Sequence, residues 1–313
     1  MIGIAGAGAF GTALAVALAA GGRQVTLWGR DSSLRANRQS PRLPGVRLPE
    51  AVTLVENVSD LAESSVVLLA LPMQQLRGFL QETGAALLGC DLVACCKGID
   101  LATLQGPAEV MRDAGARGAC GVLTGPSFAA DIARGLPTAL TLAVTGEHGE
   151  ALQAALSAPT LRLYRTEDVV GAELGGALKN VIAIGAGVVI GAGLGDSARA
   201  ALVTRGYAEM QRLALALGAR AETLAGLSGL GDLILTCTSA QSRNFAHGVA
   251  LGAGQATAQA TVEGVATAQA AVRLAHDRGI EMPVAAMVAR LVAGDIDVNE
   301  AVRQLMSRPL KQE

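Results

Sequence analysis

The amino-terminal half of the chain alternates short apolar runs with longer segments of helical spacing. Buried strands are predicted at 2–5, 24–28, 66–71, 91–96, 121–124 and 138–144. Each run is rich in apolar, often β-branched residues, and helix-like stretches separate several of them. This alternation is typical of a doubly wound parallel sheet that carries helices on both faces.

From about residue 167 the pattern changes to long Ala- and Leu-rich segments with helical spacing. We expect helices at 169–190, 197–217, 243–252, 261–278, 283–293 and 299–306, with no strand among them. The predicted fold class is therefore α/β. An amino-terminal Rossmann-type parallel-sheet domain (residues 1–170) would bind a dinucleotide, and an all-α carboxyl-terminal domain (residues 171–313) would hold substrate and catalytic groups.

Composition narrows the function classes. Hydrophobic residues make up 51% of the 313 residues and aromatic residues only 2%, which favours close-packed helices and parallel strands over an aromatic-rich sandwich. The net charge of -2 provides no basic footprint, so no nucleic-acid partner is expected. The five cysteines form no C-x-x-C pair and indicate reduced thiols in a cytoplasmic protein. Three scattered histidines give little support for a metal site, and none is expected.

One segment raises the question of a membrane span. Residues 180–195 carry no charge, but five glycines interrupt the run and it is shorter than the ~20 apolar residues that a spanning helix needs. A buried core helix is the better interpretation.

A glycine-rich loop stands at the start of the chain, between the first predicted strand and an apolar helix. Gly6, Gly8 and Gly11 form G-x-G-x-x-G, and a second strand follows about 20 residues later. The first glycine permits the tight turn, the second lets the backbone approach a pyrophosphate, and the third allows helix and strand to pack closely. This context predicts a dinucleotide site.

The end of the second strand bears on which dinucleotide is bound. Arg30 and Asp31 follow Trp28-Gly29. A basic residue here suits a 2′-phosphate, whereas an acidic residue holds the ribose hydroxyls. Because Arg30 comes first, NADP is favoured over NAD, with Asp31 as the competing candidate.

Lysine is rare in this chain. Only Lys97, Lys179 and Lys311 occur, beside 22 arginines. A lysine can be desolvated until it releases a proton near neutral pH, whereas a guanidinium stays charged. Lys97 follows a predicted strand, and Lys179 lies in an apolar helix with Gly175 and Gly176 on the same face. Lys179 is thus a candidate general acid; the alternative is a lysine that snorkels from a core helix.

Three further polar clusters stand in apolar or glycine-rich surroundings. They supply Ser127 with nearby backbone amides, Asp232 with Thr236, Ser242, Arg243 and Asn244, and Glu263. Each has an ordinary structural alternative, since Asp232 or Ser242 could cap a helix or stand in a turn. Together with two lysines in unusual settings, they predict one pocket. A guanidinium with amide donors suits a phosphate dianion, and two ammonium groups suit a developing alkoxide.

The segments GAGAFGTALA, CKGID, GPSFAADIARGLPTA, ELGGALKNVIAIGAG, GLGDLILTCTSAQSRN and VEG resemble, in order and spacing, the bacterial NAD(P)-dependent glycerol-3-phosphate dehydrogenases. The likeness runs over nearly the whole chain, and GALKNVIAIGAG and GLGDL with the later SRN are its most specific parts. Ala9 departs from the family, where serine is common, so one side-chain contact to the pyrophosphate is expected to be absent.

This resemblance implies reversible reduction of dihydroxyacetone phosphate to sn-glycerol 3-phosphate, a precursor of phospholipids. It implies a general acid/base role for Lys179, with Lys97 and Asp232 beside it in catalysis. The implied substrate contacts are Lys97, Gly125, Ser127, Lys179, Asp232, Ser242, Arg243 and Asn244. The implied cofactor contacts are Gly6, Gly8, Phe10, Gly11, Arg30, Lys97, Ala129, Arg243 and Glu263. A homodimer is left open as the assembly.

Two alternatives remain. A β-hydroxyacid or 6-phosphogluconate-type dehydrogenase also pairs a Rossmann domain with a lysine from a helical domain, but the Ser242-Arg243-Asn244 cluster argues against it. A non-catalytic NAD(P)H-binding sensor would bind cofactor without turnover, and it would have no need of a desolvated proton donor.

Overall fold

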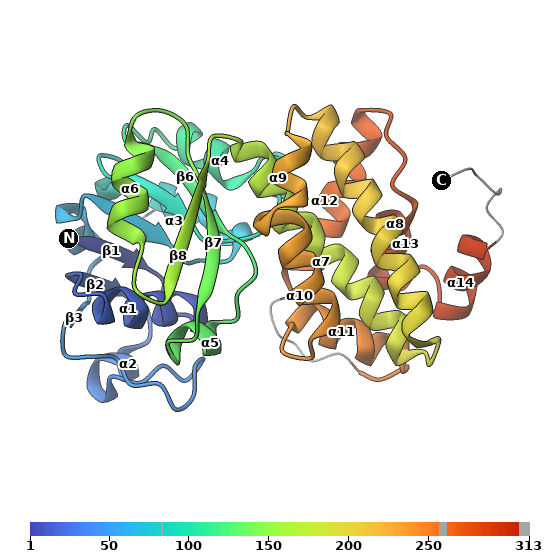
Figure 1. Ribbon diagram of the computed structural model, residues 1–313, viewed down its shortest axis with the longest axis horizontal. Coiled ribbons are helices and arrows are strands. Elements are labelled where there is room, and N and C mark those ends of the chain that lie inside the picture. Colours follow the sequence, from blue (N-terminus) through green and yellow to red (C-terminus); the bar gives the residue numbers. More distant parts are fainter. Residues whose placement is uncertain (83, 257–261, 307–313) are drawn as a thin grey trace.

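A twisted sheet forms the first half of the protein, and a bundle of helices forms the second (Figure 1). The computed structural model describes residues 1–82, 84–256 and 262–306. Lys311 and residue 261, the first residue of the helix predicted at 261–278, lie outside these ranges. Within them, the sheet has eight strands in the order β3-β2-β1-β4-β5-β6-β7-β8. The strands are β1 (Ile2–Ala5), β2 (Val25–Trp28), β3 (Val52–Val55), β4 (Val66–Leu69), β5 (Asp91–Ala94), β6 (Cys120–Thr124), β7 (Thr138–Ala143) and β8 (Leu161–Thr166).

Helices cover both faces of this sheet because successive side chains of a buried strand point to opposite sides. Ile2 and Ile4 of β1 pack in one apolar cluster with α1 (Ala9–Ala20) and α6 (His148–Leu156). Ala5 joins a second cluster with α3 (Met73–Glu82) and α4 (Pro107–Asp113). Three short elements, η1 (Val58–Glu63), η2 (Gly84–Leu87) and α2 (Ser32–Asn37), complete the connections. The predicted Rossmann-type domain is confirmed.

The sheet departs from the prediction in three places. β7 runs antiparallel to β6, because the chain turns back through α5 (Ala129–Ala133) at the edge where β6 ends. The remaining neighbours are parallel. β3 and β8 were not predicted. Both are edge strands, and β8 alternates buried leucines with exposed Arg162 and Tyr164, so no continuous apolar run marks it.

The second half is all helical and is built around one central helix. α7 (Val169–Gly191) contacts most of the others: α8 (Gly195–Ala216), α9 (Ala221–Ala225), α10 (Asp232–Thr238), α11 (Arg243–Gly252), α12 (Glu263–Asp277) and α13 (Pro283–Ala293). α14 (Val298–Met306) packs on α13, and a π-helical turn, η3 (Leu227–Gly231), precedes α10. The six predicted helices are present, while α9, η3 and α10 were missed in a glycine-rich stretch. The domain boundary near residue 170 stays a prediction.

α7 and α11 approach so closely that their backbones touch. A Cβ on Gly187 would lie 2.1 Å from the Phe245 carbonyl oxygen, and one on Gly191 would lie 2.1 Å from that of Val249. The approach is reciprocal, since a Cβ on Gly248 would lie 2.1 Å from the Ile184 carbonyl oxygen. Glycine is therefore required here for space.

α7 is also the one described helix that is long and apolar enough to cross a membrane by composition. In the apolar window of α7, 89% of the residues are buried inside the protein. This burial agrees with the prediction of a core helix.

Candidate active site

The predicted site residues of the first domain gather at one edge of the sheet. Gly6 follows β1, Arg30 follows β2, Lys97 follows β5 and Gly125 follows β6. These four strands are parallel, so their carboxyl ends meet at the same edge, which is where open α/β sheets bind ligands.

The glycine loop has the geometry that a pyrophosphate needs. Gly6 has φ +117°, and a Cβ there would lie 2.4 Å from the Ala70 carbonyl oxygen. A Cβ on Gly11 would lie 2.0 Å from the Gly6 carbonyl oxygen, so this glycine lets α1 start directly against the loop. Around Gly8, no atom of the described residues lies within 4 Å of a Cβ position. The loop thus offers open backbone beside a helix amino end, and the residues present fit a dinucleotide.

The other predicted cofactor residues lie on both sides of this loop. Phe10 and Ala129 pack in one apolar cluster where α1 meets α5. Arg30 is exposed, and its guanidinium donates a hydrogen bond to Gln75 Oε1 at 3.4 Å. Arg30 therefore lies where β2 ends, beside the first residues of α3.

The centre of the candidate site is a carboxylate held between two lysines. Asp232 Oδ1 lies 3.1 Å from Lys179 Nζ, and Asp232 Oδ2 lies 2.5 Å from Lys97 Nζ. Lys97 also donates to the Gly125 carbonyl oxygen at 3.0 Å. The Lys179 ammonium donates to Thr236 Oγ1 at 2.7 Å, and that hydroxyl lies 3.2 Å from Asp232 Oδ1. The structure thus brings together groups from β5, β6, α7 and α10.

Two adjacent glycines on α7 make this convergence possible. A Cβ on Gly175 would lie 2.7 Å from the Ser228 carbonyl oxygen, in the π-helical turn that leads to Asp232. A Cβ on Gly176 would lie 2.6 Å from Thr124 Oγ1 and 3.5 Å from Lys97 Cγ. Gly175 therefore admits the segment that leads to Asp232, and Gly176 admits the side chain of Thr124 at the end of β6, beside which Lys97 lies in ordinary contact.

Burial sets the electrostatics of Asp232, Lys179 and Lys97, which form the triad of the site. The side chains of Asp232, Lys179 and Lys97 are 1%, 8% and 14% exposed. Burial lowers the pKa of Lys179 to about 8, and the Lys97 charge acts in the same direction, while Asp232 opposes them. Burial alone would raise the pKa of Asp232, but the two ammonium groups outweigh it and hold that pKa below its usual range. The result is an ionised carboxylate beside an amine that titrates near neutral pH.

A second group of predicted residues lies where α11 and α12 begin. Ser242 caps α11, because its Oγ accepts a hydrogen bond from the Phe245 N–H at 3.2 Å. Asn244 donates to Asn180 Oδ1 at 2.8 Å and accepts from the Gly264 N–H at 3.0 Å. These contacts link α7, α11 and α12 into one polar seam.

Charged groups at this seam face the lysines. Burial raises the pKa of Glu263, an effect that Arg243 and both lysines of the triad oppose, so Glu263 lies within their electrostatic reach. Arg243 is exposed, so its guanidinium group is accessible from solvent. Ser127 lies partly buried on the loop after β6, with its Oγ 3.3 Å from the Gly125 carbonyl oxygen.

Two residues of the site were given no role from sequence. Thr236 was noted only as a polar residue of its cluster, although it stands four residues after Asp232, so that one turn of α10 places both beside Lys179. Asn180 directly follows Lys179 and is buried in a helix interior, where an amide without a partner would be costly. Its partner, Asn244, is 64 residues away and could not be read from spacing.

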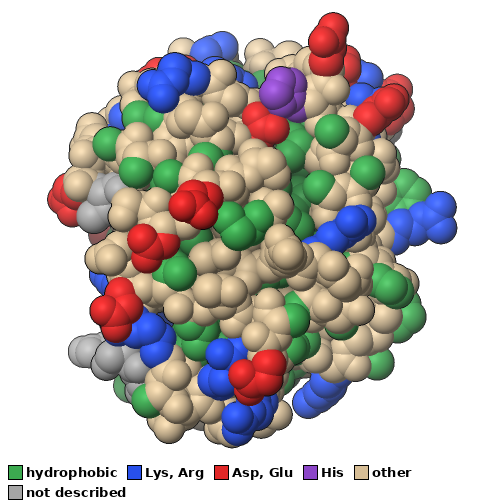
Figure 2. All heavy atoms as spheres, turned by 90° about the vertical axis from the view of Figure 1, so that its left-hand side faces the viewer, with side chains coloured by type: hydrophobic (Ala, Val, Ile, Leu, Met, Phe, Trp, Pro, Cys, Tyr) green, Lys and Arg blue, Asp and Glu red, His purple; other side chains and the backbone are tan. Residues whose placement is uncertain are grey.

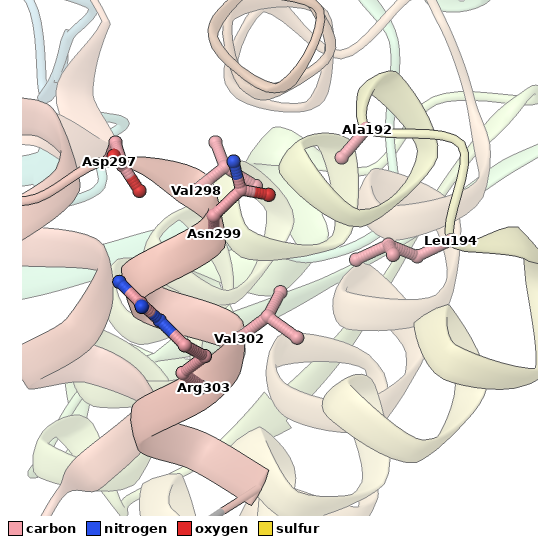
Figure 3. Close-up of a pocket in the computed structure, with 7 residues that line it drawn as sticks. All are labelled: Ala192, Leu194, Asp297, Val298, Asn299, Val302 and Arg303. Atoms are coloured by element: carbon pink, nitrogen blue, oxygen red, sulfur yellow. The ribbon is translucent and has the colours of Figure 1, made fainter.

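A hollow on the surface of the helical domain does not coincide with the predicted site residues. A hollow of about 560 Å³ lies between α14 and the turn after α7, lined by Val298, Val302, Leu194 and their neighbours (Figure 3). Its described lining includes none of the predicted site residues. On the outer end of the Rossmann domain, acidic and basic side chains are interspersed (Figure 2).

Comparisons with known proteins cover nearly the whole chain. Residues 1–150 match the family model of the NAD-dependent glycerol-3-phosphate dehydrogenase N-terminus, and residues 168–303 match that of its C-terminus. A Cereibacter sphaeroides protein named glycerol-3-phosphate dehydrogenase [NAD(P)+] is 64% identical over the full length of both chains. One of the same name from Paracoccus denitrificans is 60% identical, covering 100% of this chain and 99% of its own.

A solved structure extends the likeness to three dimensions. The crystal structure of glycerol-3-phosphate dehydrogenase from Coxiella burnetii superposes with a TM-score of 0.92 at 34% identity, covering 98% of both chains. The two family models and the full-length sequence likeness agree with each other and with the fold. This chain belongs to the NAD-dependent glycerol-3-phosphate dehydrogenase family.

Proposed function

We propose that the protein interconverts dihydroxyacetone phosphate and sn-glycerol 3-phosphate with NAD(P)H, and that Lys179 is its general acid/base. The observation that carries the proposal is the buried Asp232 carboxylate held between Lys179 and Lys97 at the ligand-binding edge of the sheet. Names of full-length relatives support the reaction, and the geometry supports the residue roles.

The proton step follows from the pKa of Lys179. The cofactor, when bound, supplies or accepts the hydride. In reduction, the Lys179 ammonium donates a proton to the carbonyl oxygen as negative charge develops there; in oxidation, the neutral amine removes it. A pKa of about 8 suits both directions, since each protonation state is accessible near neutral pH. Lys97 supplies a second positive charge, and Asp232 holds both ammonium groups in place.

The second polar group suits the substrate phosphate. Arg243 is exposed at the first turn of α11, where backbone N–H groups add to its guanidinium donors. We assign Ser242 and Asn244 supporting positions beside it, and Gly125 and Ser127 the opposite wall on the loop after β6. Glu263, Phe10 and Ala129 are assigned to the cofactor.

The reaction is tested by following NADPH absorbance with purified protein. We expect NADPH to be consumed when dihydroxyacetone phosphate is added, and we expect no NADPH to form when the protein is given NADP+ with β-hydroxyacids. Oxidation of hydroxyacids without oxidation of glycerol 3-phosphate would support the β-hydroxyacid alternative. Cofactor binding by fluorescence without turnover of either substrate would support the sensor.

Cofactor preference is a separate proposal that rests on Arg30. Its exposed guanidinium at the end of β2 suits a 2′-phosphate, so kcat/KM should be higher for NADPH than for NADH, and Arg30→Ala should reduce the difference. A strong preference for NADH would refute the assignment. We place the protein in the cytoplasm, as a source of glycerol 3-phosphate for phospholipids; a homodimer is the assembly to test by light scattering.

A further inference from the structure

Glu173 is a half-buried acid that the proposed chemistry does not use. It lies on α7, six residues before Lys179, and its carboxyl group reaches across to the other domain. There Glu173 Oε1 accepts a hydrogen bond of 2.7 Å from the Ala108 N–H, in the first turn of α4. The contact joins the helix of Lys179 to a helix of the Rossmann domain.

The amino end of α4 is shaped around this carboxyl group. A Cβ on Gly106, the residue that precedes α4, would lie 2.3 Å from Glu173 Oε2. The Gly106 backbone has φ -76° and ψ 166°, which any residue adopts. The glycine therefore leaves open the space that the Glu173 carboxyl group occupies, and a side chain there would displace that carboxyl group.

The loop before α4 carries Lys97, and it is braced internally. Asp100 is buried and accepts hydrogen bonds from the Thr103 N–H at 3.1 Å and the Thr103 hydroxyl at 2.7 Å. Its own N–H donates to the Gln105 carbonyl oxygen at 2.9 Å. A loop closed in this way moves as one piece, so a displacement at Gly106 reaches Lys97.

We propose that Glu173 is a positioning residue: its carboxyl group ties the amino end of α4, and with it the Lys97 loop, to the helix that carries Lys179. The ionised carboxylate is the stronger acceptor for the Ala108 N–H, but it places a charge between the two domains; the neutral carboxyl group keeps the bond without that desolvation cost, which is the larger effect. The inference rests on the proposed roles of the two lysines.

The surroundings of Glu173 allow both protonation states near neutral pH. Burial raises the pKa of Glu173 to about 7, the Ala108 N–H and Arg112 oppose this effect, and Glu109 adds to it. Cys96, after β5, also lies within its electrostatic reach. A raised carboxyl pKa stabilises the fold fully below the pKa of the unfolded chain, and this stabilisation is lost as pH rises through about 7. The tie should therefore loosen between pH 6 and pH 8.

The decisive variant is Glu173→Gln, which keeps the acceptor oxygen and the shape but cannot ionise. The measurement is the ratio of wild-type to variant kcat/KM for dihydroxyacetone phosphate across pH 6–8. Lys179 and the substrate phosphate titrate in the same way with both enzymes, so their effect on kcat/KM drops out of this ratio. We expect a ratio near one at pH 6 that falls about threefold by pH 8. A ratio that stays flat, or rises, would overturn the proposal.

Glu82→Gln is the matched control, since it removes a carboxylate from the exposed end of α3 and Glu82 is not among the groups that shift the pKa of Glu173. Its ratio to wild type should be flat. Thermal unfolding tests the tie without substrate: wild-type Tm should fall relative to Glu173→Gln as pH rises from 5 to 8. If the protein does not reduce dihydroxyacetone phosphate, the proposed function is wrong, whatever the variants show. A Tm difference between wild type and Glu173→Gln that does not change with pH would contradict the proposal for Glu173 alone.

Discussion

The two halves of α7 use glycine for different purposes. In the amino half, Gly175 and Gly176 make room for the turn that leads to Asp232 and for the side chain of Thr124. In the carboxyl half, Gly187 and Gly191 make room for the backbone of α11. From sequence the two pairs look alike, because each is a pair of small residues on one apolar helix.

The two halves differ in what lies beside their glycines. Beside the amino half lies the segment that leads to Asp232, so Lys179 is desolvated but keeps a carboxylate partner. Beside the carboxyl half lies another helix, and the contact is apolar. Glycine costs a helix about 1 kcal/mol relative to alanine, so each pair is tolerated only for the close approach that it permits. The apolar half fixes the helix, and the polar half uses that rigidity for chemistry.

Removal of the Lys179 amine should have the largest effect on the polar half. Lys179→Ala should lower kcat by about 10² to 10⁴, the usual contribution of general acid catalysis. Lys179→Arg should recover little of this loss, because a guanidinium does not release its proton. Steady-state rates for reduction measure both variants, and near wild-type turnover of the arginine variant would refute the proton role.

The same variants separate proton transfer from simple positive charge. Wild-type reduction should weaken as pH rises through about 8, where Lys179 loses its proton. The residual activity of Lys179→Ala should not show this decrease at alkaline pH. If the decrease persists in the alanine variant, the titrating group is a residue other than Lys179.

In the apolar half, Gly187→Ala should act on stability. Its methyl group would overlap the Phe245 carbonyl oxygen and force α7 from α11, at a cost of about 2 kcal/mol or more. Gly78→Ala is the control: it lies in α3 with no described atom within 4 Å of the new Cβ, so it should stabilise by about 0.5 to 1 kcal/mol. Urea unfolding measures both, and equal effects would contradict the need for space at Gly187.

Sequence patterns predicted the fold where burial was complete. Interior strands such as β1 and β4 are continuous apolar runs, and α7 has unbroken helical spacing. The edge strands β3 and β8 were missed because one side of an edge strand need not be apolar. The antiparallel direction of β7 was missed because a 13-residue connection does not reveal by itself whether the chain crosses the sheet or turns back.

The candidate site was predictable where residue type carries the chemistry. Lys97, Lys179 and Asp232 were singled out by their unusual settings, and the structure brings them together. The bond from Glu173 to Ala108 and the Asn180 to Asn244 contact join positions more than 60 residues apart. Each residue alone is unremarkable in sequence, and only tertiary packing gives it a partner.

A further prediction concerns the contact at Gly176. Gly176→Ala would place a methyl group 2.6 Å from Thr124 Oγ1, so either that side chain or α7, which holds Lys179 against Lys97, must move, and kcat/KM should fall about tenfold. Thr124 Oγ1 is buried and has no hydrogen-bond partner among the described residues, so its removal breaks no bond. Thr124→Ala should therefore restore most of the activity in the double variant, because it vacates the space that the new methyl group needs. Thr124→Val, which keeps a branch at that place, should not. Additive losses in the alanine pair, with no coupling near 1 kcal/mol, would mean that Gly176 does not position Lys97 through this contact.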